Sequence, residues 1–140
     1  VNESVSNSSA QQVNSIEPIL QFCIFCDNVA IAPGGKPVFI GVFDSFLRPS
    51  PIPQFFIILR WIGGIGKYTS LIKILNPELE PIYTSDEAKM DLPHKAHPAD
   101  ARYGFVNFEF PGSGVYWVEI FLNGESYTAI PLPVYEPEKS

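Results

Sequence analysis

Two cysteines, Cys23 and Cys26, have the C-x-x-C spacing. This spacing is typical of redox and metal sites when it opens a helix or lies in a tight turn. Here the surrounding residues 19–27 are mostly apolar and predict a β-strand. Positions three apart on a strand point to opposite faces and lie about 10 Å apart, beyond the roughly 7 Å limit for a disulfide. We therefore predict that the pair forms no bridge, that Cys26 is a core residue and that Cys23 has no role.

Two histidines, His94 and His97, lie in segment 85–100, which is rich in carboxylates and has no clear period. Two imidazoles and a carboxylate oxygen are ligands that zinc and iron accept. However, Pro93 and Pro98 disfavour a helix that would present both rings together, and no third ligand follows at a motif spacing. Two hypotheses stay open: solvated loop histidines, or a metal site in a metal-binding protein or metal-dependent enzyme. Because imidazoles titrate at about pH 6.5, the loop can also respond to pH.

No other motif in the sequence indicates a reaction. The glycine-rich segment 63–66 joins two predicted strands, so it lacks the helix N-terminus that a phosphate site uses. The nucleophile elbow of hydrolases, G-x-S-x-G, does not occur. We therefore predict a protein that is not an enzyme, with no catalytic residue and no cofactor.

Aromatic side chains that point away from the predicted core are the strongest candidates for binding. In the strand predicted at 115–122, alternation places Trp117, Glu119 and Phe121 opposite the apolar set, and a neighbouring strand adds Tyr127. Exposed aromatic clusters are typical of surfaces that bind a partner or a ligand. We predict a protein-binding or assembly module, with a carbohydrate-binding module as an alternative. The face is otherwise expected to be covered by the N-terminal segment, by the histidine loop or by another sheet.

The rest of the sequence predicts the elements that position these residues. Apolar segments alternate with turn signals at the spacing typical of sandwiches and barrels, and no segment keeps a helical period. We expect an all-β fold, an antiparallel β-sandwich of about seven or eight strands. The predicted strands cover residues 19–27, 37–43, 54–62, 67–75, 81–84, 101–110, 115–122 and 126–135.

Alternation also predicts which side of each strand faces the core. Phe39 and Phe43 are expected to point outward. The expected inward sets of the first four strands are Leu20, Phe22, Ile24 and Cys26; Val38, Ile40 and Val42; Phe55, Ile57, Leu59 and Trp61; and Tyr68, Ile72 and Ile74.

The last two strands are joined at 123–124 by Asn-Gly, which closes either a two-residue turn or a three-residue loop with a bulge. A plain two-residue turn would divide the apolar residues of the two strands between opposite faces. The three-residue loop pairs Phe121 with Glu125 and keeps the apolar residues together. It also places Tyr127 opposite Glu119, and we prefer it.

Composition supports a folded, β-rich domain. Of the 140 residues, 46% are hydrophobic, 14% aromatic and only 17% charged, which excludes disorder for most of the chain. Two of the 14 prolines, Pro131 and Pro133, lie in the last predicted strand and require an unpaired edge because they lack amide donors. We expect a disordered arm at 1–17, one domain at 18–136 and a tail at 137–140.

Charge and hydropathy limit the classes of partner. The net charge is −6, and the nine basic residues are dispersed, so nucleic acid is not an expected partner. The longest apolar run, 55–59, is far shorter than the roughly 20 residues that cross a bilayer, so we expect no membrane span. The absence of a disulfide framework favours the cytoplasm. Because the sequence begins with Val1, a removed export signal stays open.

The segment from Gly114 to Ile120 resembles the penultimate strand of immunoglobulin-like domains, where a tyrosine precedes the second disulfide cysteine by two residues. Tyr116 stands at the tyrosine position, but Val118 replaces the cysteine. Trp61 resembles the core tryptophan of these domains. The resemblance therefore implies a sandwich that is immunoglobulin-like in outline, and not an antibody-type domain.

A second resemblance covers more of the chain and is carried by several short motifs. They are Phe25-Cys-Asp27, Gly34-Gly-Lys36, Ile40-Gly-Val-Phe-Asp44, the proline-rich link at 49–53, Phe110-Pro-Gly-Ser-Gly-Val-Tyr116 and Leu122-Asn-Gly-Glu125. With these motifs the chain resembles a group of small bacterial single-domain proteins of unknown function. The resemblance implies the fold and a bacterial origin, and it brings no activity, cofactor or catalytic residue.

Overall fold

The computed structural model describes residues 15–47 and 51–136, which form nine β-strands and no helix. No helix in these ranges is therefore long and apolar enough to cross a membrane. The predicted arm up to residue 14 and the predicted tail at 137–140 lie outside the described residues. The strands are β1 (Ile19–Ile31), β2 (Pro37–Phe43), β3 (Ile52–Ile62), β4 (Gly66–Leu75), β5 (Pro81–Thr84), β6 (Ala88–Leu92), β7 (Ala99–Phe108), β8 (Gly114–Leu122) and β9 (Glu125–Val134).

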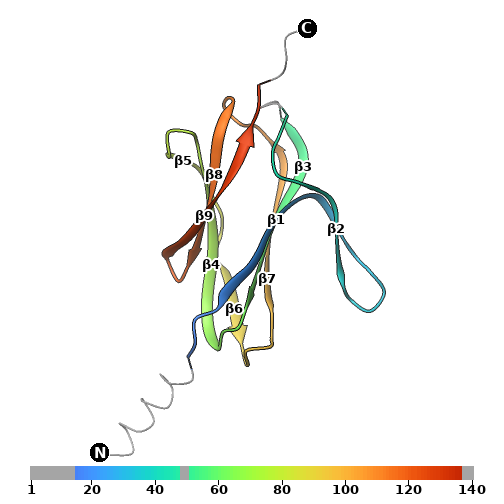
Figure 1. Cartoon of the computed structure of the whole chain (residues 1–140), viewed down its shortest axis with the longest axis vertical. Coiled ribbons are helices and arrows are strands. Elements are labelled where there is room, and N and C mark those ends of the chain that lie inside the picture. The colour runs from blue at the N-terminus through green and yellow to red at the C-terminus, as the bar shows by residue number, and fades with distance from the viewer. Residues whose placement is uncertain (1–14, 48–50, 137–140) are drawn as a thin grey trace, which may run out of the picture.

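The strands form two antiparallel sheets that face each other along the long axis of the molecule (Figure 1). The strand order is β2-β1-β3-β7 in the first sheet and β5-β4-β8-β9 in the second, where β6 also pairs with β4. The predicted antiparallel β-sandwich is confirmed. The described residues hold nine strands, however, and not seven or eight.

The core fills the space between the two sheets. The predicted inward set of β3 is confirmed, because Phe55, Ile57, Leu59 and Trp61 have no exposed surface. Phe55 stacks on Phe105 with 4.5 Å between the ring centres. The second sheet contributes Ile72, Ile74, Tyr116, Val118, Ile120, Leu132 and Val134 to the same core.

Strand β6 lies in the segment that we expected to be a loop. It pairs with the first half of β4, and its residues Met90 and Leu92 are buried. The expectation of an irregular segment over 85–100 was therefore wrong, and only residues 93–98 connect β6 to β7. Acidic residues before this five-residue strand and a proline after it hid its two-residue period.

Strand β1 presents a different face from the one that simple alternation predicts. Its ladder with β3 shifts register between Leu20 and Phe22, and a shift by one residue turns every later side chain over. Phe25 and Cys23 therefore pack with the inter-sheet core. Cys26 is fully buried, as predicted, but lies outside that core cluster. The prediction that Cys23 has no role in packing was wrong, and both thiols are free.

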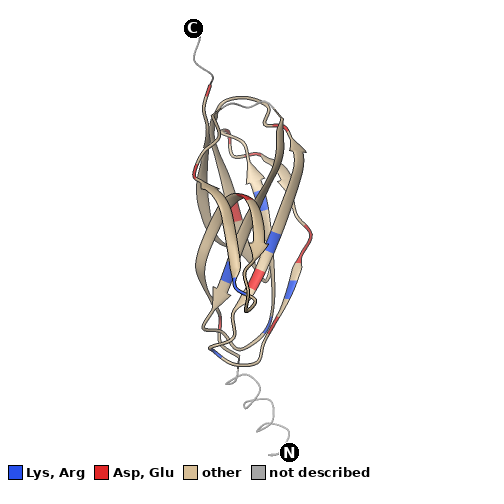
Figure 2. Cartoon of the chain, turned by 90° about the vertical axis from the view of Figure 1, so that its right-hand side faces the viewer, with Lys and Arg blue, Asp and Glu red and all other residues tan. Residues whose placement is uncertain are grey.

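The second half of β1 and all of β2 form an arm that folds back over the outer side of the first sheet. Figure 1 shows this β1–β2 arm on the side away from the second sheet, and Figure 2 shows it in front of the first sheet. Phe39 on the arm reaches Phe22, with ring centres 5.8 Å apart. On its far side Val38, Ile40 and Val42 are 41%, 47% and 63% exposed, so the predicted inward set of this strand was wrong.

Gly41 allows the arm to bend. The β1–β2 ladder omits the pair that Gly41 would make with Asp27. Gly41 has a φ of +68°, and a Cβ there would collide with the Asp27 carboxylate. Beyond the bend, Phe43 packs against the inter-sheet core, contrary to its predicted outward position.

The β8–β9 hairpin keeps the predicted apolar face but reaches it by a different turn. Leu122 pairs with Glu125, and residues 123–124 between them have φ values of +50° and +78°, which makes a two-residue turn. The predicted three-residue loop was therefore wrong. The bulge lies further along, where the register shifts between Ile120 and Phe121. Because the bulge adds one residue to β9, the apolar residues of both strands still share the inner face.

Strand β9 lies at the edge of the second sheet, as its prolines require. The end of this edge is covered by the segment that follows β2. The Phe46 amide donates to the carbonyl oxygen of Pro133 at 2.9 Å, and the Phe46 carbonyl accepts from the Tyr135 amide at 2.8 Å. The predicted edge position of Pro131 and Pro133 is confirmed.

Candidate binding surface

The candidate surface is the side of β4, β8 and β9 that points away from the first sheet, here called the outer face. On the central strand β8, Trp117, Glu119 and Phe121 alternate with fully buried residues of the core. All three are half-buried and lie on the outer face, as alternation predicts.

Apolar residues of the neighbouring strands surround Trp117. Leu75 of β4 and Pro131 of β9 are its direct cross-strand partners. Val115, two positions before Trp117 on β8, is 43% exposed. At the other end of the strand, Leu71 is the cross-strand partner of Phe121. The outer face is therefore a largely apolar surface with two aromatic side chains on its central strand.

One cation and one carboxylate lie in the middle of this apolar surface. Lys73 of β4 and Glu119 of β8 are cross-strand partners. The Lys73 Nζ lies 5.0 Å from the centre of the Phe121 ring, a cation–π contact. Glu119 Oε2 accepts a hydrogen bond of 2.7 Å from Ser126 Oγ. Lys73 and Glu119 form no salt bridge with each other. The ion pair of the described residues joins Arg60 to Asp100, on the first sheet.

Tyr127 is not part of the outer face, although we predicted it there. The bulge in β9 removes it from the register, and Glu119 pairs with Ala129 in its place. The Tyr127 ring meets the ring of Trp61 edge to face at 4.9 Å, and its hydroxyl accepts from the Leu20 amide at 3.3 Å. Tyr127 therefore closes one side of the core between the sheets.

Of the covers that we considered, neither the histidine segment nor the other sheet lies over the outer face in the described part of the chain. Residues 88–92 extend the second sheet sideways as β6, and the β1–β2 arm lies against the first sheet. Residues 1–14 fall outside the described part of the chain. Residues 15–17 run along a different part, where Ile16 and Ile65 exchange two backbone hydrogen bonds of 2.9 Å.

The two histidines lie in the short connection from β6 to β7. Their ring centres are 5.7 Å apart, and the His97 amide donates to the His94 carbonyl at 3.0 Å. Both side chains are exposed. Within residues 15–47 and 51–136, no three His, Cys, Asp or Glu side chains gather as a metal site. The turn thus brings the two imidazoles together but adds no third ligand from the described residues.

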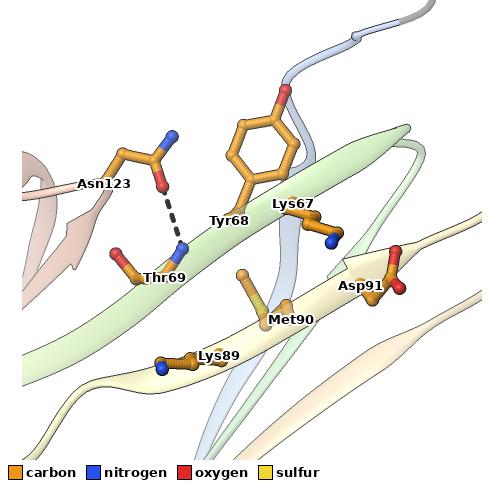
Figure 3. Close-up of a pocket in the computed structure, with 7 residues that line it drawn as sticks. All are labelled: Lys67, Tyr68, Thr69, Lys89, Met90, Asp91 and Asn123. Atoms are coloured by element: carbon orange, nitrogen blue, oxygen red, sulfur yellow. Dashed lines mark hydrogen bonds between the residues drawn. The ribbon is translucent and has the colours of Figure 1, made fainter.

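A shallow cleft that sequence reasoning missed lies between β4, β6 and the β8–β9 turn (Figure 3). It has a volume of about 370 Å³. Asn123 holds one wall, because its Oδ1 accepts from the Thr69 amide at 2.8 Å. The cleft is assembled by the cross-strand pairing of β4 with β6 and by the nearby β8–β9 turn, so no spacing in the sequence signals it. The lining residues are Lys67, Tyr68, Thr69, Lys89, Met90, Asp91 and Asn123.

The thiols are poorly suited to nucleophilic chemistry. Burial raises the pKa of Cys23 to about 12. Burial, with the nearby Asp27 carboxylate, also raises the pKa of Cys26. Because the thiolate is the reactive form, both side chains stay protonated and inert at neutral pH.

The basic residues are spread singly over the strands that Figure 2 shows. Arg60 is engaged by Asp100 through two hydrogen bonds of 2.7 and 2.8 Å. Its guanidinium also lies 5.2 Å from the centre of the Phe22 ring. Our prediction that nucleic acid is not a partner rests on this dispersal and stays a prediction.

Comparison with known proteins gives a family but no activity. The model of a family of unknown function, DUF6941, matches residues 21–135. No curated protein matches the chain. Among solved structures, a β-glucosidase from Listeria innocua in complex with glucose is similar, with 9% sequence identity and a TM-score of 0.45. The match covers 84% of this chain and 17% of that one.

Proposed function

Because the chain belongs to a family of unknown function, DUF6941, we propose its function from its own surface: it is a non-catalytic module that binds a protein through its outer face. The observation that carries the proposal is the position of Trp117. This side chain lies on the central strand of the outer face, between Leu75 and Pro131. Neither the histidine segment nor the first sheet lies over it in the described part of the chain. A large apolar surface in that position favours association, since water is released when a partner covers it.

The composition of the outer face also supports protein binding. Trp is among the residues that most often dominate binding energy, and aromatic residues are enriched at the centres of interfaces. Here Trp117 and Phe121 supply aromatic area, while Lys73 and Glu119 are the charged residues between them. The cleft beside β6, by comparison, is shallow and has two lysines on its walls.

We also propose an immunoglobulin-like outline for the sandwich and a bacterial origin for the chain. The outline is supported by Tyr116, whose hydroxyl donates to the Gly112 carbonyl at 2.7 Å and accepts from the Gly112 amide at 3.1 Å. A tyrosine corner makes hydrogen bonds of this kind. The bacterial origin is supported by the sequence motifs alone.

The experiment compares variants of the full tagged chain. Trp117→Ser and Phe121→Ser each remove an aromatic ring from the outer face. Val106→Ser is the matched control, since Val106 is 73% exposed on β7 in the other sheet. Each protein is incubated with a lysate of the cells that naturally produce it, and retained proteins are quantified by mass spectrometry. Self-association of each variant is measured in parallel by sedimentation velocity.

We expect the two outer-face variants to lose retention or self-association by at least about tenfold, as interface aromatics do. Val106→Ser should behave as the wild type, and all variants should unfold at similar denaturant concentrations. Unchanged binding in Trp117→Ser would overturn the proposal. A variant that loses binding only because it unfolds would show that the ring belongs to the core.

A second candidate is a metal-binding protein that uses the loop between β6 and β7. It is supported by the 5.7 Å separation of the His94 and His97 rings. Two imidazoles on one turn can share a zinc or iron ion when a third ligand completes the site.

A further inference from the structure

We propose that the partner of the outer face is a second copy of this chain, in a two-fold symmetric dimer that pairs Lys73 of each copy with Glu119 of the other. This inference rests on the proposed function of the outer face and specifies the partner. It is drawn from the order of residues along β4 and β8, which makes the face complementary to itself.

The two strands carry matching sets of residues at three successive outward positions. In the β4–β8 ladder, Leu71 is opposite Phe121, Lys73 is opposite Glu119, and Leu75 is opposite Trp117. Each cross-strand pair thus combines an aliphatic with an aromatic side chain, or a cation with a carboxylate. Strand β4 holds the aliphatic and cationic members, and β8 holds the aromatic and anionic members.

Symmetry converts these neighbours into contacts between copies. A two-fold axis that runs parallel to the strands, between β4 and β8 and above the face, places β4 of one copy over β8 of the other. Every residue then lies over its own cross-strand partner in the second copy. Lys73 meets Glu119, and Trp117 meets Leu75. An isologous interface repeats each such contact twice.

The charges agree with this arrangement. Lys73 and Glu119 lie close to the sheet, against Phe121 and Ser126 respectively. They are half-buried and form no salt bridge with each other in the described residues. A partner with a strong charge of one sign would find no complementary field on this face. A second copy offers one carboxylate for each cation and one cation for each carboxylate.

The size of the face also suits a dimer. The three strands of the outer face span about 14 Å, and the nine residues of β8 extend about 30 Å. A stable interface uses about 800 Å² of accessible surface on each partner, and side chains that stand on a sheet of this size provide an area of that order. Two sheets that pack face to face lie about 10 Å apart and keep their strand directions within about 30° of each other, which an axis along the strands satisfies.

Charge reversal tests the pairing. Lys73→Glu gives a copy with two carboxylates on the outer face, and Glu119→Lys gives a copy with two cations. Each single variant brings like charges together in a homodimer, so each should dimerise at least tenfold more weakly than the wild type in sedimentation equilibrium. An equimolar mixture of the two variants should form a one-to-one heterodimer, because opposite charges then meet at both positions. The double variant K73E/E119K should dimerise like the wild type.

Lys36→Glu is the control for net charge, because Lys36 is exposed in the turn of the β1–β2 arm. It should leave the dimer unchanged. Thermal unfolding of all variants at low concentration separates folding from association, since Lys73 and Glu119 are also neighbours within one chain. Recovery of association on mixing cannot come from that intrachain effect, because it requires contact between two chains.

The outcomes separate this inference from the proposed function. A wild-type chain that stays monomeric at millimolar concentration overturns the dimer. So does a dimer that survives both single reversals, or a mixture that fails to associate although each variant is folded. In these cases the proposed function still stands if Trp117→Ser abolishes retention of another protein, and it fails with the dimer if Trp117→Ser changes nothing.

Discussion

The hydroxyl of Tyr116 stabilises the turn that leads into β8 by hydrogen bonding to the backbone of Gly112. Its removal tests how much this turn contributes to the stability of the central strand of the outer face. The Tyr116 side chain is 1% exposed, and its ring packs against Phe110 with 4.9 Å between the ring centres. Its hydroxyl donates to the Gly112 carbonyl and accepts from the Gly112 amide. Tyr116→Phe removes one oxygen atom and both hydrogen bonds, while the packing of the ring is retained.

Each hydrogen bond contributes roughly 0.5–1.5 kcal/mol, and an unsatisfied buried group costs about 1–3 kcal/mol. Gly112 is half-buried, so water reaches its backbone groups and lowers the cost of leaving them unpaired. We therefore expect Tyr116→Phe to lower the free energy of unfolding by about 1–2 kcal/mol. For a domain of this size each kcal/mol lowers the melting temperature by about 4 °C, so the expected decrease is about 4–8 °C.

The assay is urea unfolding followed by circular dichroism, with thermal unfolding as a second measurement. Tyr135→Phe is the matched control, because Tyr135 is 54% exposed and its hydroxyl is free to bond with water. It should change the free energy of unfolding by less than about 0.5 kcal/mol. A Tyr116→Phe variant as stable as the wild type, or equal losses of stability in the two variants, would show that the hydroxyl does not hold the turn.

Three further predictions concern the arm, the thiol and the histidines. Gly41→Ala should lower the free energy of unfolding more than Gly35→Ala, because both positions have positive φ but only a Cβ at position 41 meets a neighbour. Hydrogen exchange near Phe22 should also accelerate in Gly41→Ala alone. Equal losses of stability in the two variants would contradict the bend at Gly41. Burial raises the Cys23 pKa from 9.0 to about 12, so the stability that the protonated thiol contributes is fully present below pH 9.0 and is lost as the pH rises towards about 12. The midpoint of urea unfolding should therefore fall between pH 8 and about pH 10.5, and it should fall less in Cys23→Ala. An identical fall in that variant would refute this cause. Elemental analysis of the purified chain should find no stoichiometric zinc or iron, and metal that His97→Ala removes would favour the metal-binding candidate.

Strands with a clear polar marker could be predicted from the sequence in detail. On β3 and β8 the inward positions are all apolar, and the polar residues Arg60 and Glu119 identify the other face. The inner and outer sides of both strands were therefore predicted correctly, and with them Trp117 and Phe121 on the outer face. A period of two is a local property, so no knowledge of the neighbouring strands is needed.

Faces that depend on a bulge could not be predicted in this way. One shifted residue after Leu20 turns Cys23 and Phe25 towards the core. A second bulge moves Tyr127 from the outer face to the side of Trp61. The position of each bulge follows from the register with the partner strand. That register depends on packing between residues far apart in the chain.

The orientation of the β1–β2 arm could not be predicted for a related reason. Alternation correctly separates Val38, Ile40 and Val42 from Phe39 and Phe43, but it cannot state which set faces the protein. Because the arm folds back at Gly41, the aromatic set contacts the protein and the aliphatic set faces solvent. The bend is a tertiary feature, and its only local signal is the glycine.

Association of the chain should cover Trp117, and the two tryptophans of this protein allow a direct measurement. Trp61 has no exposed surface, so quenching by acrylamide reports almost entirely on the half-buried Trp117. We expect strong quenching in the dilute monomer and loss of the quenchable component as the protein concentration rises through the association range. Quenching that stays constant while the mass of the complex increases, or a Trp117 already shielded in the dilute monomer, would show that Trp117 does not lie in the interface.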